Sequence, residues 1–104
     1  MTDLQYTEFL RRSVLVHSYI YYELNANVIE DYRYDKLAAE LVVKQKDKDN
    51  QRGMYWDIFM DFDGSTGFDL YHRLNEYDKD RIKSISILIL NTYNSDGKAK
   101  GNIK

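Results

Sequence analysis

The sequence predicts an all-α fold, a compact bundle of four to five helices whose first two helices form an antiparallel hairpin. The chain contains no proline in 104 residues, which is typical of long helices joined by short turns. Apolar residues recur at spacings of three and four along much of the chain, which is the period of helices that bury one face. A content of 43% apolar and 31% charged residues indicates one soluble globular domain with a modest core.

The first predicted helix spans residues 4–25. Its expected buried face consists of Leu10, Val14, His17, Tyr21 and Leu24, at spacings of three or four. Arg11, Arg12 and Ser18 are expected at the margin of this face or outside it. Residues 25–27 (Asn-Ala-Asn) should end the helix, because asparagine tolerates the left-handed conformation found at helix ends.

The second predicted helix starts near Asp31 and ends near Lys46, after Val28 and Ile29 have packed under the turn. The Asp31 carboxylate is expected to cap this helix by accepting hydrogen bonds from unpaired backbone N–H groups. The expected apolar face consists of Tyr34, Leu37, Ala38, Leu41 and Val42. Because only a short turn joins the two helices, they should lie antiparallel.

The sequence in the middle of the chain predicts two short helices separated by loops. Residues 44–52 are polar and form the first loop, residues 54–60 form an aromatic helix, residues 61–67 form a turn-rich loop, and residues 68–76 form a further short helix. Four aromatic residues that flank the second loop are expected in the core: Trp56, Phe59, Phe62 and Phe68.

The last predicted helix begins at Asp78, as its cap, and ends near Tyr93. Residues 85–90 are rich in isoleucine and also fit a strand. We favour the helix because Ile82, Ile85, Ile89 and Tyr93 keep a spacing of three or four, and because a lone strand would lack a partner.

Composition restricts the class of protein. Residues 1–94 are expected to form a single helical domain, and residues 95–104, with two glycines among lysines and asparagines, a flexible tail. A formal net charge of −2 gives no indication of direct nucleic-acid or membrane binding. The chain has no cysteine, no signal-peptide pattern at its start and no apolar run of 18 residues, so we expect a cytoplasmic protein without a membrane span. The two histidines lie far apart in the sequence, so no metal is expected.

Residues 57–81 form an acidic segment with seven acidic and three basic residues. Such a segment can contact a protein partner, and the candidate residues are Asp57, Asp61, Asp63 and Asp69.

The loop at residues 61–66 (Asp-Phe-Asp-Gly-Ser-Thr) invites two further interpretations. It resembles the Asp-x-Asp-Gly-Thr nucleophile loop of haloacid-dehalogenase-type phosphatases, but only 43 residues follow Asp61, too few for the sheet and magnesium ligands of that fold. The loop does not fit an EF-hand calcium site, because Phe59 and Leu70 would occupy ligand positions and neither side chain can coordinate calcium. A turn in which Ser65 or Thr66 caps the next element fits best.

A candidate ligand site lies where the first two predicted helices meet. Tyr21 and Tyr22 lie near the end of the first helix, and Asp31, Tyr34 and Asp35 share one face of the second. Aromatic faces beside carboxylates suit a flat cation such as the nicotinamide ring of NAD, with a cation–π contribution of roughly 0.5–2 kcal/mol. The two carboxylates can also accept hydrogen bonds from ribose hydroxyls or from the carboxamide.

Residues 10–45 resemble the start of NAD-dependent DNA ligases, where helical subdomain Ia binds the nicotinamide mononucleotide (NMN) half of NAD. The family pattern is Tyr followed by Tyr or His, about eight residues, Asp-x-x-Tyr-Asp and, one residue on, an aliphatic side chain. Tyr21 and Tyr22 match the aromatic pair, and Asp31, Tyr34 and Asp35 match the second set. The resemblance implies that these five residues contact NMN or shape its pocket. The ligase Lys-x-Asp-Gly motif, whose lysine accepts AMP, does not occur in the chain, so we expect no catalysis.

The leading prediction is therefore a non-catalytic module, similar to subdomain Ia, that binds NMN or NAD. We expect an affinity on the order of 0.1–1 mM, because the adenylation domain that completes the ligase pocket is missing. The resemblance also implies a free-standing phage or mobile-element protein that acts in the host cytoplasm. The alternative is a small inhibitory or counter-defence protein whose acidic segment contacts a host enzyme. A third hypothesis is a split-enzyme part that completes a separate adenylation domain.

Overall fold

The computed structural model describes residues 1–65 and 67–95. Within these residues the chain forms four α-helices, two short 3₁₀ turns and no strand. The elements are α1 (Asp3–Tyr22), α2 (Asp31–Gln45), η1 (Lys48–Asn50), α3 (Trp56–Phe59), η2 (Tyr71–Arg73) and α4 (Glu76–Ser95). The all-α prediction is confirmed, and residues 85–90 are helical, inside α4. The predicted tail lies outside the described residues from residue 96 onwards.

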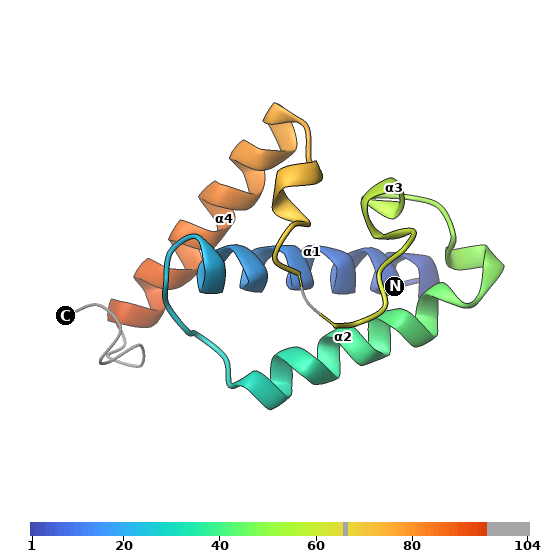
Figure 1. The fold of residues 1–104 in the computed structure, drawn as a ribbon, viewed down its shortest axis with the longest axis horizontal. Helices are drawn as coiled ribbons and strands as arrows, with labels where there is room; N and C mark the ends of the chain where they lie inside the picture. The colour runs from blue at the N-terminus through green and yellow to red at the C-terminus, as the bar shows by residue number, and fades with distance from the viewer. Residues whose placement is uncertain (66, 96–104) are drawn as a thin grey trace.

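Helix α1 is the centre of the fold, because α2 and α4 both pack against it. Figure 1 shows α1 and α2 running in opposite directions, and α4 crossing α1 obliquely. The first two helices therefore form the predicted antiparallel hairpin. The linker between them, residues 23–30, closes one end of the hairpin.

Local sequence determines where α1 begins and ends. Thr2 and Gln5 form a capping box: the Gln5 N–H donates to Thr2 Oγ1 at 3.0 Å, and the Thr2 N–H donates to Gln5 Oε1 at 2.8 Å. The helix ends at Tyr22, three residues before the predicted end. Asn25 has a φ of 53°, which agrees with the left-handed turn expected of the asparagine pair.

The predicted caps of the other two long helices are wrong. Glu30 is the N-cap of α2 without a side-chain bond, and Asp31 is the first helical residue. At α4, Asn75 Oδ1 accepts from the Asp78 N–H at 2.8 Å. An N-cap side chain binds the N–H two or three residues further on, so Asn75 is the cap and Asp78 lies inside the first turn.

An apolar core lies between the three long helices and α3. Its fully buried side chains include Leu10, Val14, Leu15, Leu41, Phe59 and Ile82. Phe68 was predicted in this core but is 58% exposed. The predicted helix at residues 68–76 is only the turn η2, and the Phe68 ring packs edge-on against Tyr22, with ring centroids 5.2 Å apart.

Arg11, expected near the surface, is fully buried. Its guanidinium donates to Gln45 Oε1 at 2.7 Å and to the backbone carbonyls of Arg52 at 2.9 Å, Met54 at 3.1 Å and Asn50. A buried charge is tolerated where its donors are satisfied, and here one side chain joins α1 to α2 and to the following loop. Ser18, also expected at the margin, is 3% exposed.

Candidate ligand-binding pocket

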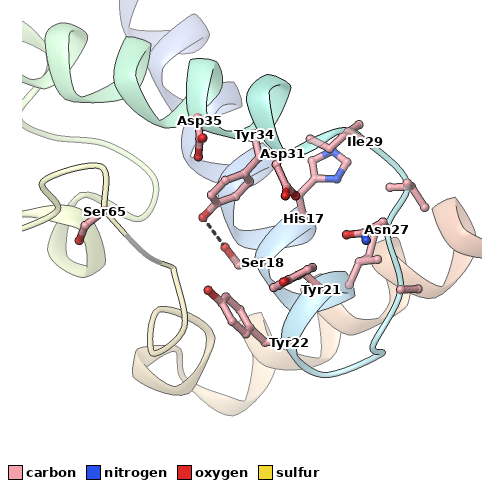
Figure 2. A pocket seen from close by; sticks show the side chains of 13 residues that line it. His17, Ser18, Tyr21, Tyr22, Asn27, Ile29, Asp31, Tyr34, Asp35 and Ser65 are labelled. Atoms are coloured by element: carbon pink, nitrogen blue, oxygen red, sulfur yellow. Dashed lines mark hydrogen bonds between the residues drawn. The ribbon is translucent and has the colours of Figure 1, made fainter. Parts of the chain in front are cut away.

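A cavity of about 240 Å³ lies at the closed end of the α1–α2 hairpin. Its walls come from the last turns of α1, the linker, the first turns of α2 and the loop at Ser65 (Figure 2). The five residues predicted from the sequence all line it: Tyr21, Tyr22, Asp31, Tyr34 and Asp35. The structure therefore brings together side chains that the pattern placed on two separate helices.

Tyr34 is the most firmly positioned of the five. Its Oη forms a hydrogen bond of 2.8 Å with Ser18 Oγ, drawn as a dashed line in Figure 2. Burial raises the pKa of Tyr34 above its ordinary value of 10.0, so the phenol is protonated at neutral pH. Gly67 packs directly beneath this pair: a Cβ there would overlap Ser18 Oγ and lie 2.6 Å from Tyr34 Oη. Gly67 therefore leaves space for the Ser18–Tyr34 pair, whose hydrogen bond orients the Tyr34 ring.

Tyr21 and Tyr22 form the aromatic rim. Their rings meet edge to face, with centroids 4.9 Å apart, and the two residues are 48% and 40% exposed. Phe68 continues the rim from the opposite loop through its contact with Tyr22. Half-exposed aromatic rings at the mouth of a cavity can take up a flat ligand without prior unfolding of the core.

The charged lining is entirely acidic. Asp31 and Asp35 project from the first turns of α2, one turn apart. Neither has an ion-pair partner within the described part of the chain, and no lysine or arginine is among the described residues that line the cavity. The cavity therefore favours a positively charged ligand.

His17, Ser18, Asn27 and Ser65 also line the cavity. The sequence interpretation allowed His17 to line the same pocket as Tyr21 but assigned no ligand-binding role to any of the four. His17 lies four residues before Tyr21, one helical turn away, and this spacing is the signal that places it on the same wall. Burial lowers the pKa of His17 below its ordinary value of 6.5, so the ring is neutral at neutral pH. Its Nδ1 is buried and has no hydrogen-bond partner among the described residues.

The four aspartates of the acidic segment are all exposed, and three of them are hydrogen-bonded within the protein. Arg73 binds two of them, Asp61 at 2.8 Å and Asp69 at 3.0 Å. Asp63 accepts from the N–H of Ser65 at 2.9 Å and from its Oγ at 2.6 Å. These bonds lower the pKa values of Asp61 and Asp63. Asp57 stays exposed on α3.

Hydrogen bonds within the loop fit the interpretation of residues 61–67 as a structural turn. Among the residues with assigned structure, no group of three or more acidic, histidine or cysteine side chains is placed to bind a metal ion. In the same residues, no helix has the length and apolar character needed to span a bilayer.

Comparison of the chain with protein-family models, with curated proteins and with solved structures gave no match in any of the three.

Proposed function

We propose that this protein is a non-catalytic module that binds NMN or NAD through the nicotinamide half, in the manner of ligase subdomain Ia. The observation that carries the proposal is the cavity at the end of the α1–α2 hairpin. All five residues that the sequence pattern predicts line this cavity.

The chemistry of the walls supports a pyridinium ligand. A flat cationic ring can lie against the tyrosine faces, where cation–π attraction adds roughly 0.5–2 kcal/mol. Asp31 and Asp35 supply negative charge that no described neighbour neutralises. A cavity of about 240 Å³ can hold a single ring system with part of its ribose. The phosphate or the AMP half would then extend into solvent, which agrees with an affinity on the order of 0.1–1 mM.

The alternative, an inhibitor that acts through its acidic segment, has less support. Two of its four aspartates are paired with Arg73 and a third is bound to Ser65, so only Asp57 remains without a described partner. Charge reversal of Asp57 with retained nucleotide binding and lost biological activity would favour this alternative. Nucleotide transfer that appears only when a separate adenylation domain is added would favour a split enzyme.

Ligand-observed NMR and calorimetry with NMN, NAD and AMP test the proposal directly. We expect saturation transfer confined to the pyridine half of NMN and NAD, and none for AMP. Asp35→Asn should weaken binding about tenfold, because it removes a charge-assisted hydrogen bond or an equivalent electrostatic contact. Asp57→Asn, which makes the same change on α3 outside the cavity, is the matched control and should leave the affinity unchanged. Absence of heat at millimolar NMN rejects the proposal.

A further inference from the structure

A shallow groove lies between the end of α4 and the linker that joins α1 to α2. Tyr93, on the last turn of α4, lines this groove together with residues 27–31. Figure 1 shows the same arrangement, with the last turn of α4 beside the linker. Asp31 and residues 27–29 line both the groove and the cavity, so the two adjoin at this stretch of the chain.

The charged side chains of this surface are carboxylates. Glu30 lines the groove, Asp35 lines the cavity, and Asp31 lines both. All three residues are exposed, and none has an ion-pair partner within the described part of the chain. The surface between the groove and the cavity therefore attracts cations.

The chain that follows α4 carries cations. Residues 96–104 contain three lysines and one aspartate. Ser95, the last residue of α4, lies two positions after Tyr93, about 3 Å further along the helix axis. Lys98 comes three residues after Ser95, a span of at most about 11 Å, and Gly97 between them permits a reversal of chain direction. The connection is therefore long enough for the ammonium group of Lys98 to reach the groove.

We propose that residues 96–104 occupy the acidic groove and compete with a cationic ligand for the entrance of the cavity. Lys98 and Lys100 interact with Glu30 and Asp31, and this contact neutralises a carboxylate that a bound cation would otherwise face. The contact is intramolecular, so it needs no second molecule and does not depend on protein concentration. The competition with NMN rests on the proposed function, whereas the contact itself does not.

Amide NMR spectra of the full-length protein test the contact without any nucleotide. We expect the double substitution Lys98→Gln and Lys100→Gln to shift the amide signals of residues 27–31. The matched control is Lys46→Gln with Lys48→Gln, which removes two exposed charges beyond the far end of α2. These lysines lie roughly 22 Å or more from the start of α2, well beyond the screening length of about 8 Å at physiological salt, so the control should leave the same signals unchanged.

The reverse experiment perturbs the groove and observes the C-terminal segment. Asp31→Asn should shift the amide signals of residues 97–101, and Asp57→Asn, the same change on α3, should not. Absence of shifts in both directions would overturn the inference and leave the proposed function standing. Shifts whose size depends on protein concentration would assign the segment to a second copy of the chain and would also overturn it.

Calorimetry with NMN then tests the competition. The double substitution at Lys98 and Lys100 should raise the NMN affinity about two- to fivefold, the range expected when exposed ion pairs no longer compete, and the control at Lys46 and Lys48 should not. An unchanged affinity in the first variant would overturn the competition. Failure of NMN to bind both the wild type and this variant would reject the proposed function, whereas the shifts in the nucleotide-free spectra would still support the contact.

Discussion

Replacement of Arg11 by methionine removes the buried hydrogen bonds that join α1 to α2 and to the loop after it. Methionine has a similar length and fills most of the same volume, so the change isolates the loss of the guanidinium. Four acceptors lose their donor: Gln45 Oε1 and the carbonyl oxygens of Asn50, Arg52 and Met54.

The size of the effect follows from how buried these acceptors are. The bonds to Gln45 and Asn50 are buried, and an unsatisfied buried polar group destabilises by about 1–3 kcal/mol. The bonds to Arg52 and Met54 are partly buried, so water can replace the lost donor and their loss costs less. We expect Arg11→Met to lower the free energy of unfolding by about 3–6 kcal/mol, a large part of the about 5–15 kcal/mol available to a small domain.

Urea denaturation followed by far-UV circular dichroism measures this change. The matched control is Arg12→Met, the same substitution at the next position, where the side chain is half-buried and makes no hydrogen bond within the described residues. The control should change the free energy of unfolding by less than about 0.5 kcal/mol. A loss below about 1 kcal/mol for Arg11→Met, or equal losses for both variants, would refute the reasoning that Arg11 stabilises the fold through its acceptors.

Three further predictions concern the site and the helix ends. Gly67→Ala should lower the free energy of unfolding by about 1–3 kcal/mol and weaken NMN binding, because the added Cβ displaces Ser18 and Tyr34. Urea titration measures the change in stability and calorimetry the change in affinity. If neither quantity changes, Gly67 does not pack against Ser18 and Tyr34 as described. As the pH falls through about 6.5, the unfolded chain binds a proton at His17 before the folded chain does, so stability should decrease as the pH is lowered below neutrality. Asp31, Tyr34 and Asp35 on α2 and Tyr21 on α1 share the cavity with His17, and His17→Asn should reduce this pH dependence of the urea midpoint. Asn75→Ala should destabilise the protein by about 1 kcal/mol, because α4 loses its N-cap, and thermal unfolding measures this change. An effect within experimental error would indicate that Asp78 is the cap instead.

Periodicity predicted the helices well where one face of a helix is apolar over several turns. The isoleucines of α4 show this clearly: Ile82 is fully buried and Ile85 and Ile89 are half-buried on the same side. Helix ends were harder to place, because any short polar residue within three positions can act as the cap. Asn75 and Asp78 are both good caps by type, and only the geometry of the chain before α4 selects Asn75.

Long-range partners explain the errors in burial. Arg11 reads as a surface residue because charged side chains are seldom buried, and its four acceptors lie 34 to 43 positions further along the chain. Phe68 was expected in the core because it is a large apolar residue. The predicted helix at this position is replaced by the short turn η2, so no helical face places Phe68 in the core. A local sequence pattern contains no information about contacts with residues this far along the chain.

The site shows the same division between local and distant information. Tyr21, Tyr22, Asp31, Tyr34 and Asp35 were predictable because helical spacing and one tight turn place them together. Gly67 packs against the hydrogen-bonded pair of Ser18 and Tyr34 from 33 positions beyond Tyr34, and no pattern in the first two helices indicates this contact.

This distant contact gives the acidic segment a role within the protein. Arg73 donates to Asp61, to Asp69 and to the backbone carbonyl of Ile58 at 3.1 Å, so it ties together the chain before and after Gly67. The aspartates that suggest a docking surface in the sequence therefore help to position the loop that supports the Tyr34 ring. If they act in this way, Arg73→Met should weaken NMN binding although Arg73 does not line the cavity. Lys79→Met, which removes a half-buried lysine and its ion pair with Glu76 on α4, should not. Calorimetry on these two variants separates a supporting loop from a docking surface, because a docking surface would leave the NMN affinity of both unchanged.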